Sequence, residues 1–523
     1  MEKRVAIVGA GISGLLACKY AAARGFTPMV FEEQDEVGGL WNHTIESTRL
    51  QNAKVTFEFS DFPWPSSIED MFPTNFQVVE YLQSYAHNFG LLPYIKFNSK
   101  VMDMDYVGES EEEMRSWEFW GATGKAFGSK GNWILKVFNS KDNSTLEYEA
   151  EFVIICIGRF SGLPDIPKFA AGFGPEIFSG KVVHSMDYSA MDNTAAADFI
   201  KGKRVAIIGS SKTAVDTAFE CAMANGSDHP CTIIQRTPHW ALPDAFPWGI
   251  NFGYFCATRF SELMIHKPGQ GLLSSLIANL LQPLRWAMSK FVESYIRWKL
   301  PLKKYGMVPK ESFLQEIAAC QIYMLPETFY DKVESGSIVL HKTQSLISFC
   351  EDGLIIDGTT HIKADVVIFA TGYKGDEKLG NIFISPSFRN YIAGSPESTI
   401  PLYRQIIHPR IPGVAAIGYS ESASNLYSIE MRCKWMAYLL DEALQLPSIK
   451  EMEKDIQMWD KYLKRYAANG KYRRACIAGL HIWYNDQLCR DIGANPRRKK
   501  GFFADMFQPY GLLDYNGITS AAS

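Results

Sequence analysis

Four short runs along the chain are apolar, apart from Arg4 at the start of the first, and they lack the polar alternation of a half-buried strand. They lie at residues 4–8, 152–157, 205–208 and 366–370. Such runs are typical of strands that are buried on both faces of a parallel sheet. Because two of them lead into glycine-rich or serine-rich loops followed by helical sequence, the pattern predicts an α/β protein with repeated strand–loop–helix units.

The first run enters a glycine loop that is suited to a dinucleotide. It reads Gly9-Ala-Gly11-Ile-Ser-Gly14, and a second strand at residues 28–31 ends at Glu32. The glycines allow a tight turn, close approach to a pyrophosphate and close packing of helix on strand, while the carboxylate can accept from a ribose hydroxyl. We therefore predict that Gly9, Gly11, Gly14 and Glu32 bind a dinucleotide.

A second glycine-containing segment, EVGGLW, follows the predicted ribose contact. Adjacent glycines there let the backbone lie against a larger part of the ligand, which favours a flavin dinucleotide over a nicotinamide one. A surface turn with a capping tryptophan is the alternative. The predicted FAD contacts in this segment are Gly38, Gly39, Leu40 and Trp41.

The run at 205–208 begins a near copy of the first unit. Its loop has serine and alanine where the first loop has its second and third glycines, and its partner strand at 232–235 ends in Arg236. An arginine can bind a ribose 2′-phosphate, so this unit should prefer NADP, with help from Lys212. Solvated surface charges are the alternative reading. The predicted contacts are Gly209, Ser210, Ser211, Lys212, Thr213 and Arg236.

Two such units predict two Rossmann-like domains, with hydride passing from NADPH to FAD. We expect the second domain to be inserted in the first, and Ala370-Thr371-Gly372 after the last run to contact cofactor. The predicted layout is an FAD domain at 1–162 and 335–446, an NADPH domain at 163–334 with a helical insertion at about 246–326, and a helical extension at 447–523. The insertion could be core, line a substrate path, bury a dimer surface or lie on a membrane.

Composition excludes several classes of function. A net charge of -4 lacks the basic excess of a nucleic-acid-binding protein, so we expect small-molecule partners. The cysteines are scattered without a CxxC pair or a metal-like cluster, which favours a reducing compartment and predicts no metal site. The chain opens directly on a strand, and its most apolar stretch, 272–298, contains charges and Pro283. We therefore predict a cytoplasmic protein with no transmembrane span.

Between the two units lies FSGKVVHSMDY, at residues 178–188. It fits the pattern FxGxxxHxxx[YF], and GAGISG, EVGGLW, DFPWP, GSSKTA and ATGY surround it in matching order. The chain therefore resembles the flavin-containing monooxygenases, and within them the plant branch. The resemblance places His184 at the junction of the nucleotide domains, as a residue that positions NADP.

The resemblance implies a reaction. NADPH reduces FAD, O2 adds to the reduced flavin as a hydroperoxide, and NADP⁺ stays bound while an amine nitrogen or a sulfur takes the oxygen atom. Members of the family often carry Asn ten residues before the Asp of DFP, but here Asp61 is preceded at that distance by Gln51, with Asn52 next to it. Both have an amide donor, so both are predicted reaction-site residues.

Two other functions remain open. One is a Baeyer–Villiger monooxygenase acting on ketones, which shares both dinucleotide units and a sequence similar to residues 235–240. The fingerprint of that group normally ends in Trp, whereas the fingerprint here ends in Tyr188. A non-enzymatic binding protein on the same fold is the more distant alternative. The helical insertion also leaves open a homodimer or a peripheral contact with the endoplasmic reticulum membrane.

Overall fold

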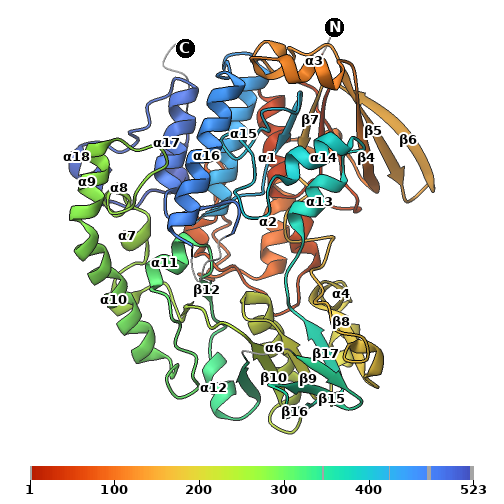
Figure 1. The fold of residues 1–523 in the computed structure, drawn as a ribbon, viewed down its shortest axis with the longest axis vertical. Coiled ribbons are helices and arrows are strands. Elements are labelled where there is room, and N and C mark those ends of the chain that lie inside the picture. The colour runs from red at the N-terminus through yellow and green to blue at the C-terminus, as the bar shows by residue number, and fades with distance from the viewer. Residues whose placement is uncertain (1–2, 344–346, 423, 468–472, 519–523) are drawn as a thin grey trace.

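The computed structural model describes residues 3–343, 347–422, 424–467 and 473–518. Two five-stranded parallel sheets form its frame, one above the other in Figure 1. Each sheet is built from the short apolar runs found in the sequence, and the strands at its centre are fully buried. The predicted α/β class with two Rossmann-like units is confirmed.

The first sheet has the order β18-β7-β1-β2-β3, and all its neighbours run parallel. Its strands are β1 (Val5–Val8), β2 (Met29–Phe31), β3 (Ile95–Lys96), β7 (Phe152–Ile155) and β18 (Val414–Ala416). Helix α1 (Ile12–Ala22) follows β1 and packs along α15 (Asn425–Leu440), a helix with nearly every side chain buried. This sheet therefore draws on both ends of the chain.

The second sheet has the order β13-β10-β9-β17-β8, again all parallel. Its strands are β8 (Lys181–His184), β9 (Val205–Ile208), β10 (Cys231–Gln235), β13 (Ile338–Lys342) and β17 (Val366–Phe369). Helix α6 (Lys212–Asn225) follows β9 and packs on β9 and β10, as α1 follows β1.

One part of the predicted layout is wrong. We expected the first domain to resume at residue 335, but β13 and β17 both belong to the second sheet, where Ile208 pairs with Phe369. The chain returns to the first sheet only at β18. A fully buried parallel strand has the same apolar composition in either sheet, so its sequence alone does not tell which sheet it joins.

A helical insertion leaves the second unit after β10. It contains α7 (Gly253–Cys256), α8 (Arg259–Leu263), α9 (Leu272–Leu280), α10 (Gln282–Lys299) and α11 (Phe313–Ala318), and it ends near β12 (Tyr323–Met324), which pairs with β11 (Ala241–Leu242). The insertion packs on the C-terminal region, along the left side of Figure 1. Buried Arg259 binds both carboxylate oxygens of Asp486, at 2.5 and 2.9 Å.

The C-terminal region holds α16 (Ile449–Arg465), β20 (Cys476–Ala478), α17 (His481–Asp491) and α18 (Phe502–Phe507). Strand β20 pairs with β19 (Glu421–Ser422), and a disulfide joins Cys476 to Cys320, just after α11. The spacing of the cysteines gave no indication of this pair. The disulfide and the Arg259–Asp486 ion pair both fix the insertion to the C-terminal region.

The remaining strands and helices lie around the two parallel sheets. Two antiparallel sheets are formed by β4 (Ser99–Val107), β5 (Asn132–Asn139) and β6 (Ser144–Ala150), and by β14 (Ser348–Cys350), β15 (Gly353–Ile356) and β16 (Thr360–Lys363). The other helices are α2 (Asn75–Asn88), α3 (Glu111–Ser116), α4 (Ser185–Ser189), α5 (Asn193–Ile200), α12 (Phe329–Glu334), α13 (Gly375–Asn381) and α14 (Pro386–Ala393). Among the described residues, none of the helices combines the length and apolar character needed to span a bilayer.

Candidate active site: one cleft shared by two loops

A cleft of about 2320 Å³ runs between the two sheets, and both predicted dinucleotide loops line it. Residues at the carboxyl ends of β1, β7, β9, β10 and β17 form much of its wall. Ligands of open parallel sheets bind at this end of the strands. A pocket for one drug-sized ligand measures about 300–1,000 Å³, so this cleft has room for more than one.

The first loop is closed in by backbone. Gly9 has a φ of +102°, and a Cβ on it would lie 2.6 Å from the carbonyl oxygen of Cys156, just after the neighbouring strand β7. A Cβ on Gly14 would lie 1.8 Å from the oxygen of Gly9. Both positions therefore exclude any side chain. The N-terminus of α1 can in this way approach a phosphate group closely.

The segment at 38–41 lies against this loop. A Cβ on Gly39 would come within 3.1 Å of the Cα of Gly11, and Gly38 and Gly39 both have positive φ values, of +136° and +58°. Leu40 and Trp41 follow and line the cleft. The two glycine segments found separately in the sequence thus form one surface.

Glu32 fastens the first loop to β2. It is buried, and its carboxylate accepts from the backbone N–H of Ala10 at 2.6 Å and of Gln34 at 3.0 Å. Burial raises the pKa of this carboxyl, against the lowering effect of the two N–H donors. Glu32 lines the cleft as predicted, but its contact with Ala10 was not foreseen from the sequence.

The second loop is more open. A Cβ on Gly209 would lie 2.4 Å from the oxygen of Ala370, so this first glycine is required, whereas Ala214 is accommodated with its side chain fully buried. Ser210, Ser211 and Thr213 line the cleft. Glycine is therefore needed at one position of this loop, not three.

Lys212 already has a partner. Its ammonium binds the carboxylate of Asp216 at 2.7 Å, one turn along α6. Asp216 is buried, and burial raises its pKa to about 6 even though Lys212 opposes the shift. Lys212 therefore reaches a phosphate only in competition with Asp216.

Arg236 is exposed at the end of β10 and lines the cleft. None of the residues that the structure describes forms a hydrogen bond or ion pair with its guanidinium. Lys342 ends the neighbouring strand, where it pairs in register with Gln235, and it lines the same part of the cleft. Sequence reasoning missed Lys342, because only the register of β13 against β10 brings the two cations together.

Ala370, Thr371 and Gly372 follow β17 and also line the cleft. They lie beside the second loop rather than the first, since Gly209 abuts Ala370. The equivalent place beside the first loop is taken by Cys156, Ile157 and Gly158, after β7. The three predicted residues therefore line the cleft, but they follow a strand of the second sheet and not of the first.

Gln51 and Asn52 both line the cleft where the first domain meets the helical insertion. The side-chain oxygen of Gln51 accepts from the backbone N–H of Met324 on β12, at 3.4 Å. With its oxygen so occupied, the amide NH2 of Gln51 is the group left to donate to a ligand.

The fingerprint residues join the two domains. Tyr188 donates to one carboxylate oxygen of Glu220 at 2.7 Å, and the hydroxyl of Ser47, in the first domain, donates to the other at 2.8 Å. His184 is buried with a lowered pKa because of desolvation, and its ring meets Tyr373 edge to face at 5.4 Å. Neither Ser47 nor Glu220 belongs to a motif, so sequence reasoning missed them both.

The cleft fits the two cofactors that the sequence suggested. In the first loop, Gly9 and Gly14 exclude a Cβ, which leaves bare backbone for a pyrophosphate. At the far side of the second loop, Arg236 and Lys342 offer positive charge where a 2′-phosphate would lie. These are the donor types that FAD and NADP require.

The chain matches the model of the family "Flavin-binding monooxygenase-like" over residues 2–507. It is 42% identical to the probable flavin-containing monooxygenase 1 of Arabidopsis thaliana, over 98% of this chain and 96% of that protein.

Two solved structures are similar in fold. The S-allyl-L-cysteine S-oxygenase of Allium sativum has a TM-score of 0.58 at 18% identity, with 94% of this chain and 89% of that one covered. Cyclohexanone monooxygenase from Rhodococcus sp. Phi1, bound to NADP⁺, has a TM-score of 0.64 at 16% identity, with 94% and 97% covered. Together with the family match, these findings show that the chain is an FAD-dependent, NADPH-using enzyme that belongs to the flavin-containing monooxygenase family.

Proposed function

We propose that this monooxygenase transfers one atom of O2 to a nucleophilic nitrogen or sulfur of a small molecule. The observation that carries the proposal is the single cleft, because it brings the loop suited to FAD and the loop suited to NADPH to the same space. When bound, FAD takes a hydride from NADPH and, once reduced, activates O2. The protein's part is to orient both dinucleotides and to exclude water.

The residues of this chain have distinct roles in the proposal. The glycines of the first loop and of segment 38–41 let FAD approach the backbone, and Arg236 with Lys342 holds the 2′-phosphate of NADPH. Gln51, whose oxygen is engaged by Met324, donates its amide N–H near the reacting atoms, and Asn52 beside it has the same amide chemistry.

Heteroatom oxygenation is favoured over ketone oxygenation by the end of the fingerprint. Tyr188 stands where Baeyer–Villiger enzymes normally carry Trp, and its hydroxyl is engaged by Glu220. An indole lacks the hydroxyl and cannot reproduce that contact in the same place. The fold itself does not discriminate, since an S-oxygenase and a cyclohexanone monooxygenase both share it.

The test is product analysis with labelled oxygen. The purified holoenzyme is supplied with NADPH, ¹⁸O2 and panels of amines, thioethers and ketones, and products are identified by mass spectrometry. We expect an N- or S-oxide that carries one labelled atom. Ester or lactone products from ketones, with no labelled amine or thioether product, would assign the enzyme to the Baeyer–Villiger group instead.

We also propose that this enzyme is cytoplasmic and makes a peripheral membrane contact through α9, of the kind expected at the endoplasmic reticulum. Leu272, Leu273, Leu276 and Leu280 are 92%, 72%, 55% and 69% exposed, and their spacing places them on one face of the helix. Helices α10 and α18 lie on the same side of the molecule as α9 (Figure 1), and they carry the exposed side chains of Trp286 and Phe503. Apolar side chains that gather on one exposed face are typical of a membrane or protein contact.

Vesicle sedimentation separates this contact from self-association. We expect the holoenzyme to sediment with phosphatidylcholine–phosphatidylserine vesicles, and the double variant Leu273→Glu and Leu276→Glu to stay in solution. The alternative result is a wild type that does not bind vesicles but is a dimer by light scattering, together with a double variant that is a monomer. That result would show that α9 contacts a second copy of the chain and not a membrane.

A further inference from the structure

The three-stranded sheet β14-β15-β16 has one buried face and one open face. Phe349, Leu354, Ile356 and Ile362 are buried in a cluster with residues of the second parallel sheet. The residues that alternate with them, among them Cys350 and His361, face outward. Because its inner face is packed, the sheet is a rigid platform for side chains on its outer face.

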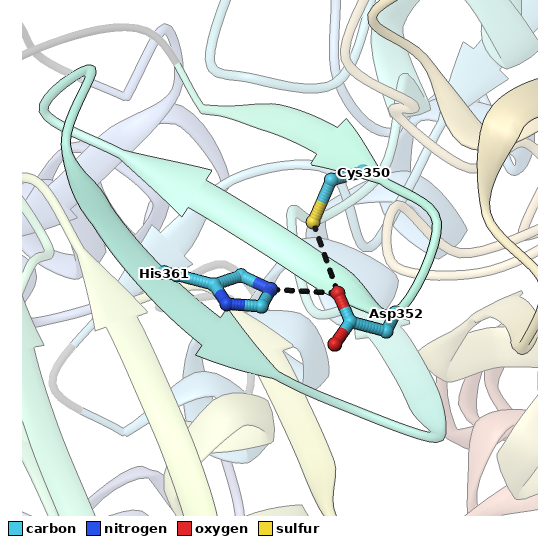
Figure 2. A group of neighbouring side chains, drawn as sticks. All are labelled: Cys350, Asp352 and His361. Carbon is cyan, nitrogen blue, oxygen red and sulfur yellow. Dashed lines mark hydrogen bonds and ion pairs between the residues drawn. The ribbon is translucent and has the colours of Figure 1, made fainter.

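Three side chains of different chemistry converge on the outer face (Figure 2). Cys350 ends β14, Asp352 lies in the turn to β15, and His361 is on β16. The Sγ of Cys350 is 3.7 Å from Oδ1 of Asp352, and Nε2 of His361 is 2.8 Å from the same oxygen. All three donor atoms lie within 4.8 Å of one another.

The central strand carries a glycine beside Cys350. Gly353 stands opposite Cys350 in the register of β14 and β15, and a Cβ on Gly353 would lie 2.0 Å from the carbonyl oxygen of Ile362. The position therefore excludes a side chain. Cys350 lies opposite Gly353 and His361 lies opposite Ile355, so the two side chains approach each other diagonally across β15, past the position that has no side chain.

We propose that Cys350, Asp352 and His361 bind one zinc ion, with water as the fourth ligand. Thiolate, imidazole and carboxylate are the three ligand types that zinc accepts, and a tetrahedral site with bonds of about 2.0–2.3 Å places its donors about 3.3–3.8 Å apart. The Cys350–Asp352 distance of 3.7 Å meets this requirement. The His361–Asp352 hydrogen bond would be replaced by two bonds to the ion, and the thiol proton would pass to solvent.

This site is separate from the dinucleotide cleft. None of its three residues is among those that line the cleft, although Ile347, directly before β14, is. The proposal is therefore independent of the proposed oxygenation reaction. It also differs from the sequence prediction, which found no metal site because no short cysteine–histidine motif is present.

Metal binding to the holoenzyme tests the proposal directly. Chelator-treated protein that retains its flavin is titrated with Zn²⁺ in competition with a chromogenic chelator, and separately with Co²⁺, whose thiolate complexes absorb in the near ultraviolet. We expect one equivalent to bind, and the cobalt–thiolate band to disappear in Cys350→Ser. His361→Ala and Asp352→Asn should each weaken zinc by more than about 10-fold, since even indirect partners of a ligand matter on that scale.

The control variant is His87→Ala, which removes an exposed histidine on α2 and should leave the affinity unchanged. Equal flavin content and melting temperature verify that each variant is folded, and if Cys350→Ser fails that check, the other two decide. Failure of the wild type to compete with the chelator would overturn the proposal. So would zinc binding that survives in both His361→Ala and Asp352→Asn, because the ion would then lie elsewhere.

Discussion

The two dinucleotide loops have the same need for glycine at their first position and different needs at their third. Gly9 faces the carbonyl oxygen of Cys156, and Gly209 faces that of Ala370. In each domain the strand beside the loop is the corresponding neighbour, β7 next to β1 and β17 next to β9. The first glycine is therefore dictated by the parallel sheet itself.

The difference comes from what covers each loop. Gly11 lies against Gly39, and Gly14 lies against the oxygen of Gly9, whereas Ala214 fits into the core. We therefore expect a ligand on the first loop to contact segment 38–41 as well. This suits a cofactor that stays bound at the first loop and one that exchanges at the second.

Exchanging the third residues of the loops should give the largest contrast. In Gly14→Ala, the new Cβ would lie 1.8 Å from the oxygen of Gly9, so the loop must move and we expect the purified protein to lose its flavin. The matched variant Ala214→Gly should keep its FAD and lose only about 1 kcal/mol of stability. Flavin absorbance per chain measures both, and a flavin-replete Gly14→Ala would contradict the enclosed first loop.

Removing the cation at the second loop should affect one coenzyme only. For Arg236→Ala we expect KM for NADPH to rise by about 10–100-fold, the usual scale for a lost charge-assisted contact, with little change for NADH. Lys212→Ala should have a smaller effect, because Asp216 already engages that ammonium. Steady-state kinetics with both coenzymes measure the two KM values. An equal rise in KM for NADPH and NADH would show that Arg236 does not contact the 2′-phosphate.

The hydrogen bonds that join the two dinucleotide-binding domains through Glu220 should affect the rate of hydride transfer and not the binding of the cofactors. Ser47→Ala or Glu220→Gln weakens the bridge from Tyr188 to the first domain, so we expect NADPH to reduce the flavin about 3–10-fold more slowly. Flavin content and the Kd for NADPH should stay near wild type. If Kd rises and the reduction rate is unchanged, Glu220 acts on coenzyme binding and not on the placement of the domains.

A smaller effect concerns the stability of the second domain. The pKa of Asp216 is raised from 3.8 to about 6 in the folded protein, so its contribution to stability is present at low pH and is lost as pH rises through about 6. Asp216→Asn should therefore flatten the fall in melting temperature between about pH 4 and pH 7. If the melting temperatures of the two proteins change with pH in the same way across that range, this assignment is contradicted.

The sequence predicted which loops line the cleft, because Gly9, Glu32, Gly209 and Arg236 each follow a recognisable strand. It did not predict which sheet β17 joins, since Val366–Phe369 is equally apolar in either place. Nor did it indicate Lys342 or the Ser47–Glu220 contact. These depend on the register between strands and the docking of domains, which no local pattern records.

Anaerobic mixing with NADPH tests most directly whether the two loops hold two nucleotides in working contact. The absorbance of the oxidised flavin is followed after the oxygen-free holoenzyme meets one equivalent of NADPH. We predict that the band bleaches completely, and that it bleaches far more slowly at the same NADPH concentration in Arg236→Ala. A holoenzyme that binds FAD and NADPH but keeps its oxidised flavin spectrum would contradict the shared cleft as the site of hydride transfer.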